Sequence, residues 1–154
     1  MKLHHIVTAC LMGLASLSGC MNDNKKDVSK ERLKSMAGGE LKEVVAIGGV
    51  VSIDGNPAAG VNLFLYRSGN IGSPIKECQT DEDGKYCWST YLTCDGVEPG
   101  TYVLGFTHVP KPKKNGTGVD MFKGKYQDPT RNKFELKVEA GAPDDDVNYD
   151  LVTK

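Results

Sequence analysis

The chain has 154 residues, with 19 Lys and Arg against 20 Asp and Glu, and 39% of its residues are hydrophobic. A net charge of -1 leaves no basic footprint for duplex nucleic acid, so no nucleic-acid partner is expected. The 18 Gly and 7 Pro favour a turn-rich β fold over a helical one, and the length suits one domain.

Residues 1–19 are typical of a secretory leader. Lys2 gives a positive start, and an apolar stretch from Ile6 to Ala15 follows, which is too short to cross a bilayer as a mature helix. The segment ends in Leu17-Ser18-Gly19-Cys20, which resembles the bacterial lipoprotein signal, in which small residues precede a lipidated cysteine. An ordinary cleaved leader with a cysteine nearby is the alternative.

The lipoprotein resemblance implies that Cys20 becomes the new N-terminus and carries several acyl chains, palmitate among them. Several chains anchor a protein to a membrane far more durably than one chain does. The membrane is therefore an expected partner, and the expected location is the cell envelope, facing the periplasm or the cell surface. Met21 in place of Asp favours the outer membrane over the inner one.

Residues 20–43 are predicted to form the lipidated N-terminus and a flexible tether, because the segment is polar and has few apolar residues to bury. A short helix over Ser29 to Met36 is left open. Residues 44–154 are predicted to form the domain.

Short β-type runs punctuated by turn residues fill that domain, and Phe134, Leu136 and Val138 alternate with charged residues as in a half-buried strand. The predicted strands are Val44 to Ile53, Val61 to Tyr66, Ile75 to Thr80, Lys85 to Tyr91, Thr101 to His108, Phe134 to Glu139 and Val147 to Val152. Strands this short need two sheets to enclose a core. We therefore predict an all-β fold, a seven-stranded antiparallel β-sandwich with Greek-key connections.

Three motifs in order resemble the carboxypeptidase regulatory-like domain. They are an Asp-Gly-x-Pro turn at Asp54 to Pro57, a Thr-Asp-x-x-Gly-x-aromatic hairpin at Thr80 to Tyr86, and a Pro-Gly-x-Tyr strand at Pro99 to Tyr102. The resemblance implies a transthyretin-like (prealbumin-like) sandwich that acts as a non-enzymatic binding or structural module for a protein or a carbohydrate. No cofactor is implied.

A metal-dependent or hydrolytic enzyme is the alternative function. The predicted mature chain keeps only His108, which we interpret as a structural residue at the end of its strand. Asp81 and Asp83 are candidate Ca²⁺ ligands, but a tight turn prefers the same residues, so no metal is predicted.

The long connection from Val109 to Lys133 is basic and partly aromatic, and connections of this length are often functional. Its candidate binding residues are Lys111, Lys113, Lys114, Phe122, Lys123, Lys125 and Tyr126. In the alternative interpretation, Phe122 and Tyr126 cap the open end of the sandwich.

Three cysteines remain in the domain, and outside the cytoplasm they are disulfide candidates first. If residues 81–84 close a hairpin, Cys78 faces Cys87 across it. Cys94 lies in a loop that can reach either residue. We prefer a pairing of Cys78 with Cys94, and Cys87 is the alternative partner.

Overall fold

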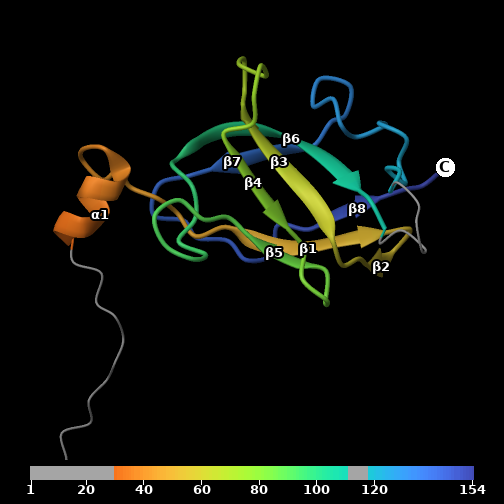
Figure 1. Ribbon diagram of the computed structural model, residues 1–154, viewed down its shortest axis with the longest axis horizontal. Helices are drawn as coiled ribbons and strands as arrows, with labels where there is room; N and C mark the ends of the chain where they lie inside the picture. Colours follow the sequence, from red (N-terminus) through yellow and green to blue (C-terminus); the bar gives the residue numbers. More distant parts are fainter. Residues whose placement is uncertain (1–29, 111–117) are drawn as a thin grey trace, which may run out of the picture.

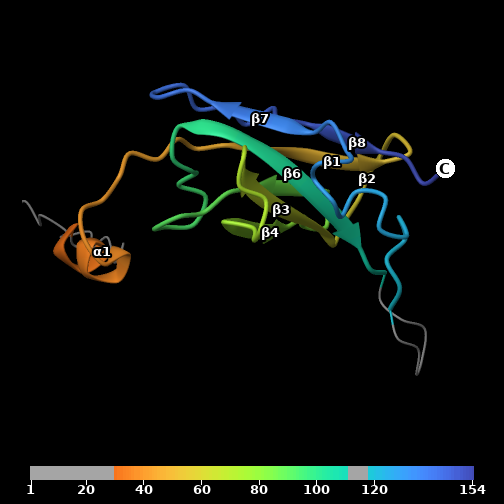
Figure 2. The same ribbon diagram turned by 90° about the horizontal axis from the view of Figure 1, so that it is seen from above.

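Tight turns and short strands build two sheets that pack face to face in this computed structural model, which describes residues 30–110 and 118–154 (Figures 1 and 2). The elements are α1 (Lys30–Ala37), β1 (Gly48–Ile53), β2 (Asn56–Pro57), β3 (Val61–Arg67), β4 (Lys76–Gln79), β5 (Lys85–Cys87), β6 (Gly100–His108), β7 (Glu135–Val138) and β8 (Tyr149–Leu151). The predicted all-β sandwich is confirmed, and each of the seven predicted runs contains a strand. The very short β2 is additional.

The first sheet is centred on β1, which pairs with β2 and β5 on one side and with β8 on the other. The second sheet has the order β4-β3-β6-β7, and all of its pairs are antiparallel. The β1–β8 pair is parallel, which differs from the prediction. After β7, which belongs to the second sheet, the chain crosses to the first sheet instead of forming a hairpin with β7. There β8 lies beside β1 and runs in the same direction.

The core lies between the two inner faces. On β3 and β6 every second side chain is directed inward, and Leu63, Leu65, Leu104 and Phe106 are fully buried there. Trp88, which follows β5, is fully buried against the same cluster. Burying one such aliphatic side chain stabilises the fold by about 1.5–3 kcal/mol, so the alternation along β3 and β6 supplies much of the driving force.

The turn after β4 does not close a hairpin, which corrects the expectation that Cys78 faces Cys87. β4 pairs with β3, whereas β5 pairs with β1 in the other sheet. The Asp81 carboxylate accepts hydrogen bonds from the backbone N–H groups of Asp83 and Lys85, both at 2.9 Å. The local turn was therefore correctly located, but it carries the chain from one sheet to the other.

Within the predicted tether, α1 lies where the sequence allows a short helix. It ends in a Schellman motif, because Gly38 has a φ of 72° and the Gly39 N–H donates to the Lys34 carbonyl at 3.1 Å. Further along, Lys42 N donates to the Tyr91 hydroxyl, and Val45 forms a bridge with Val97. The described part of the chain contains no helix with the length and apolar character needed to cross a membrane.

Candidate functional site

The structure pairs Cys87 with Cys94 in a disulfide whose Cα atoms lie 5.2 Å apart. The preferred pairing of Cys78 with Cys94 is therefore wrong, and Cys94 joins the alternative partner. Strand alternation explains the choice. Tyr86 and Trp88 are buried in the core, so Cys87 between them faces the outside of the first sheet, where the exposed Cys94 reaches it.

Cys78 lies in the second sheet and remains a free thiol. Its side chain packs against the core, and this burial raises the pKa of the thiol to about 12. A thiol with such a pKa stays protonated at neutral pH and is a poor nucleophile, because the thiolate is the reactive form. Cys78 is accordingly a packing residue.

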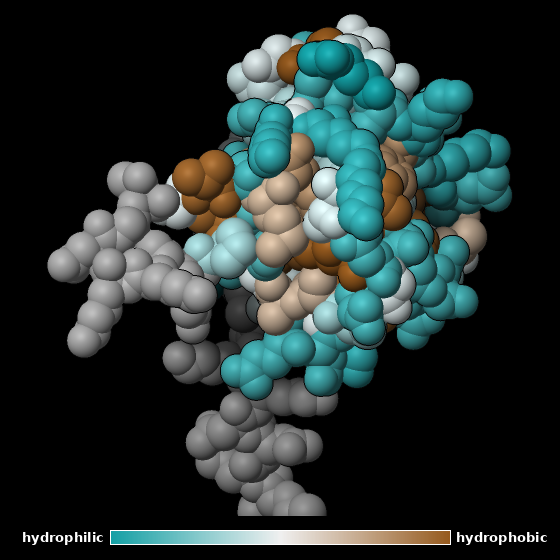
Figure 3. Space-filling view, turned by 90° about the vertical axis from the view of Figure 1, so that its right-hand side faces the viewer, coloured by the Kyte–Doolittle hydropathy of each residue, from teal (hydrophilic) through white to brown (hydrophobic). Residues whose placement is uncertain are grey.

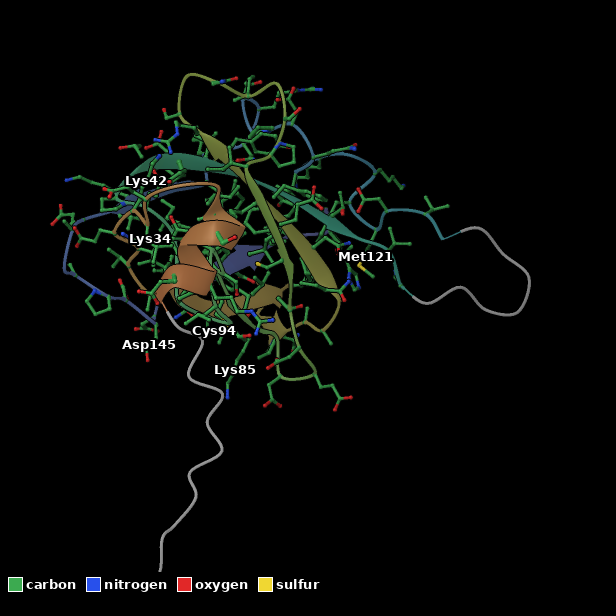
Figure 4. The ribbon with its side chains drawn as sticks, turned by 60° about the vertical axis from the view of Figure 1, so that its left-hand side comes forward. Lys34, Lys42, Lys85, Cys94, Met121 and Asp145 are labelled. Carbon is green, nitrogen blue, oxygen red and sulfur yellow. A yellow bond between two sulfur atoms is a disulfide. The ribbon has the colours of Figure 1, made fainter. Side chains whose placement is uncertain are left out.

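A hollow that we call the disulfide groove has a volume of about 630 Å³ and lies beside the Cys87–Cys94 bond. Its lining includes Gly48 and Gly49 of β1, and also Lys85, Cys94 and Asp145. Figure 4 shows Cys94 between Lys85 and Asp145 in that view. The groove therefore has both a cationic and an anionic side chain in its lining.

The predicted binding loop is divided by the structure. Phe122 and Tyr126 are only 4% and 7% exposed and pack edge to face, with ring centroids 5.1 Å apart. Both rings belong to the core cluster, so they have little surface left for a partner, and they pack as expected in the alternative interpretation. Lys123 and Lys125 are exposed. Lys111, Lys113 and Lys114 lie outside the described residues.

The Lys125 side chain also forms contacts within the protein. Its Nζ donates to the carbonyl of Lys154 at 2.7 Å and lies 5.1 Å from the centroid of the Tyr126 ring. Among the predicted lysines that the structure describes, Lys123 is the one whose side chain forms no such contact.

Two polar residues that the sequence did not single out hold this connection in place. Asp120 accepts hydrogen bonds from the backbone N–H groups of His108 and Gly124, at 2.9 and 2.8 Å. Asn132 donates to the Leu104 carbonyl at 2.9 Å and accepts from the Phe134 N–H. Asp and Asn in loops commonly bond to nearby backbone, which is the signal that could have identified them.

The candidate Ca²⁺ ligands serve the turn. One oxygen of Asp81 accepts two backbone hydrogen bonds, and Asp83 Oδ2 lies 3.8 Å from Lys85 Nζ. Within residues 30–110 and 118–154, no three His, Cys, Asp or Glu side chains are grouped so that they could hold a metal ion. We therefore interpret Asp81 and Asp83 as residues that stabilise the turn.

A second hollow of about 490 Å³, the strand-end groove, lies where β3 begins and β6 ends. Gln79, Asp81, Glu82 and His108 line it, and Val109 and Pro110 give it an apolar side. His108 Nδ1 lies 3.2 Å from the Gly60 carbonyl oxygen, which holds the ring at the rim.

The same end of the molecule has three exposed apolar side chains, those of Val109, Val119 and Met121, and Val119 is 72% exposed. Figure 3 looks onto this end and shows a hydrophobic group beside the grey atoms, with mainly hydrophilic residues around it. This end therefore combines a groove, polar side chains and apolar contact area.

No known family profile matches the chain, and no curated protein matches it in sequence. Among solved structures, the chain is similar to a variant of BcpA, the major pilin subunit of Bacillus cereus, with 16% identity and a TM-score of 0.45. The match covers 71% of this chain and 29% of the pilin, so the chain spans less than a third of the pilin's length. At this level of likeness, nothing about the role of the pilin transfers to this chain.

Proposed function

We propose that this protein is a lipid-anchored binding or structural module of the cell envelope, without enzymatic activity. The observation that carries the proposal is the Cys87–Cys94 disulfide. Disulfides persist in oxidising compartments outside the cytoplasm and are rare where glutathione and thioredoxin keep thiols reduced. The bond thus supports the export that the leader sequence predicts.

The proposed anchor is the lipidated Cys20, on the outer membrane in preference to the inner one. Acyl chains contribute about 0.8 kcal/mol for each buried methylene, so several chains together hold a protein at the membrane durably. In Figure 1, α1 lies at one end of the sandwich, and the end of β6 lies at the other. An anchor on the N-terminal side would therefore leave the strand-end groove on the far side.

We further propose that the sandwich is related to carboxypeptidase regulatory-like domains. Each of the three motifs lies at a turn or strand boundary. Asp54 and Gly55 separate β1 from β2, and Gly84 ends the turn between β4 and β5. After Pro99, β6 begins, and the Tyr102 hydroxyl donates to the Glu98 carbonyl at 2.6 Å. This is the tyrosine-corner contact that fastens such turns in β-sandwiches.

The anchor is tested by expressing the full chain in a bacterium with a lipoprotein pathway and feeding it labelled palmitate. We expect label in the protein, which should stay with the membrane fraction after a carbonate wash. Cys20→Ala should lose both the label and the membrane retention. Cys10→Ala, within the predicted leader, is the matched control and should keep both.

An unlabelled protein in the soluble fraction, with Cys20 intact, would contradict the anchoring. Equal labelling of the Cys20→Ala variant would place the lipid elsewhere and contradict the assignment of Cys20.

A further inference from the structure

A row of polar side chains crosses the outer face of the second sheet beside the strand-end groove. Asn62 of β3 is paired with Gln79 of β4 on one side and with Thr107 of β6 on the other. The Gln79 side-chain amide donates to Asn62 Oδ1 at 2.9 Å, and the Asn62 amide donates to the Thr107 hydroxyl at 3.4 Å. These bonds hold planar amides in fixed orientations on a surface that solvent reaches.

Gln79 belongs both to this row and to the lining of the strand-end groove, so the two features are continuous. Inside the groove, Thr80 is buried, and its hydroxyl is satisfied by the Ala58 carbonyl at 2.7 Å and the Val61 N–H at 2.9 Å. Thr80 therefore fixes the wall of the groove, whose lining also includes Glu82 and His108.

An aromatic ring extends the row in the other direction. Phe64 follows Asn62 by two residues along β3, so it shares the outer face, and it is only partly buried. Its neighbour on β6 is Gly105, which has no side chain to cover the ring. A Cβ at Gly105 would lie 3.0 Å from the Gln127 carbonyl oxygen, so the missing side chain also lets the loop approach and form a wall there.

From Val61 to Phe64 the strip runs along three residue steps of β3, or about 10 Å at roughly 3.3 Å per residue. Along that length the strip presents groups that can contact either hydroxyl or C–H groups. Amide, carboxylate and imidazole groups form hydrogen bonds with hydroxyl groups, and the negative face of an aromatic ring attracts C–H groups. None of the described residues lining the strand-end groove is a lysine or arginine, whereas Asp81 and Glu82 are acidic.

We propose that this strip, from the strand-end groove through Gln79 and Asn62 to Phe64, binds a neutral oligosaccharide. A sugar ring has hydroxyl groups at its edge and C–H groups on its faces, so it matches a polar row that leads to an aromatic ring. The two carboxylates disfavour an anionic sugar. The inference names the ligand class of the proposed binding module and rests on that function.

The test is a calorimetric titration of the purified full chain with cellohexaose, maltohexaose, xylohexaose and chitohexaose. We expect at least one of these neutral probes to bind. Phe64→Leu, which keeps an apolar side chain but removes the ring, and Gln79→Ala, at an exposed position, should each weaken the binding about fivefold to tenfold. Glu135→Ala, on β7 of the same sheet, is the matched control and should bind like the parent chain.

Circular dichroism and the thermal midpoint check that each variant is folded, and Gln79→Ala keeps the test valid should Phe64→Leu fail to fold. The proposal is overturned if none of the four probes binds. It is equally overturned if binding survives Gln79→Ala unchanged but is lost in Lys85→Ala, which would place the ligand in the disulfide groove. Either result leaves the lipid-labelling experiment unaffected, so failure of the ligand class is distinguishable from failure of the anchored module.

Discussion

Single Asp and Asn side chains organise the irregular segments of this protein. The Asp95 carboxylate accepts hydrogen bonds from the backbone N–H groups of Thr90, Tyr91 and Leu92, and Asn132 bridges two segments of the second sheet. Backbone groups in loops have no ladder partner, so one short side chain can satisfy several of them at once. These residues keep the ends of the sandwich ordered where no strand is present.

At the same scale, one glycine permits the approach of two backbones. Gly96 has a φ of 101°, and a Cβ there would lie 1.7 Å from the Val45 carbonyl oxygen. We expect Gly96→Ala to lower the free energy of unfolding by about 3–5 kcal/mol, because the clash with the Val45 backbone adds to the strain of positive φ. Urea unfolding near neutral pH measures the loss.

Gly55→Ala is the control, since Gly55 also has a positive φ, of 78°, but a Cβ there meets no atom within 4 Å. This variant should lose only about 1 kcal/mol. Equal losses in the two variants would show that backbone approach at Gly96 contributes nothing.

At the scale of elements, the disulfide joins the end of β5 to the loop that follows it. The two cysteines are 7 residues apart, and the segment between them contains the buried Trp88. Removing the bond by Cys87→Ser with Cys94→Ser frees a short loop in the unfolded chain. The loop-closure relation then predicts a loss of about 2–3 kcal/mol in the free energy of unfolding.

Thermal unfolding with and without dithiothreitol measures this effect. The parent chain should lose stability in the reductant, and the double variant should not respond to it. Cys78→Ala is the control for a cysteine outside the bond, and it should respond to the reductant as the parent chain does. A double variant that is still sensitive to reductant would mean that another disulfide forms.

The Asp81 turn is an element whose local and global roles differ. Its hydrogen bonds are those of a tight turn, and Gly84 supplies a φ of 77°. The strands on its two sides nevertheless belong to different sheets. The turn therefore links the two layers of the sandwich, and it also presents Asp81 and Glu82 to the strand-end groove.

At the scale of the whole molecule, the stability should fall in acid. The pKa of Asp54 lies below its ordinary value of 3.8, mainly because the Thr153 hydroxyl and then the Thr153 N–H donate hydrogen bonds to its carboxylate. A pKa that is lower in the folded state than in the unfolded chain contributes stability above 3.8. That contribution is lost as the pH falls through the folded-state value.

Urea unfolding at neutral pH and below pH 3.8 measures the dependence. We expect Asp54→Asn to show a smaller loss on acidification than the parent chain, because the amide does not titrate. Asp128, whose pKa is lowered by hydrogen bonds from Thr130, is a second contributor, so some acid dependence should remain in that variant. An identical pH dependence in both proteins would contradict the role of Asp54.

The sequence by itself determined the elements of this protein. Alternation at Phe134, Leu136 and Val138 placed a strand, and Asp-Gly and Pro-Gly pairs placed the turns, because side-chain direction and turn geometry depend on neighbouring residues alone. The all-β sandwich followed from these local signals, and so did the position of the strand-end residue His108.

Tertiary structure alone decided which elements meet. It assigned β4 and β5 to different sheets, made β8 parallel to β1, buried Phe122 and Tyr126, and joined Cys94 to Cys87 rather than to Cys78. It also brought Gln79, Asn62 and Thr107 from three strands into one row. Each of these outcomes depends on pairings between residues far apart in the chain, and the packing of two sheets around a shared core selects those pairings.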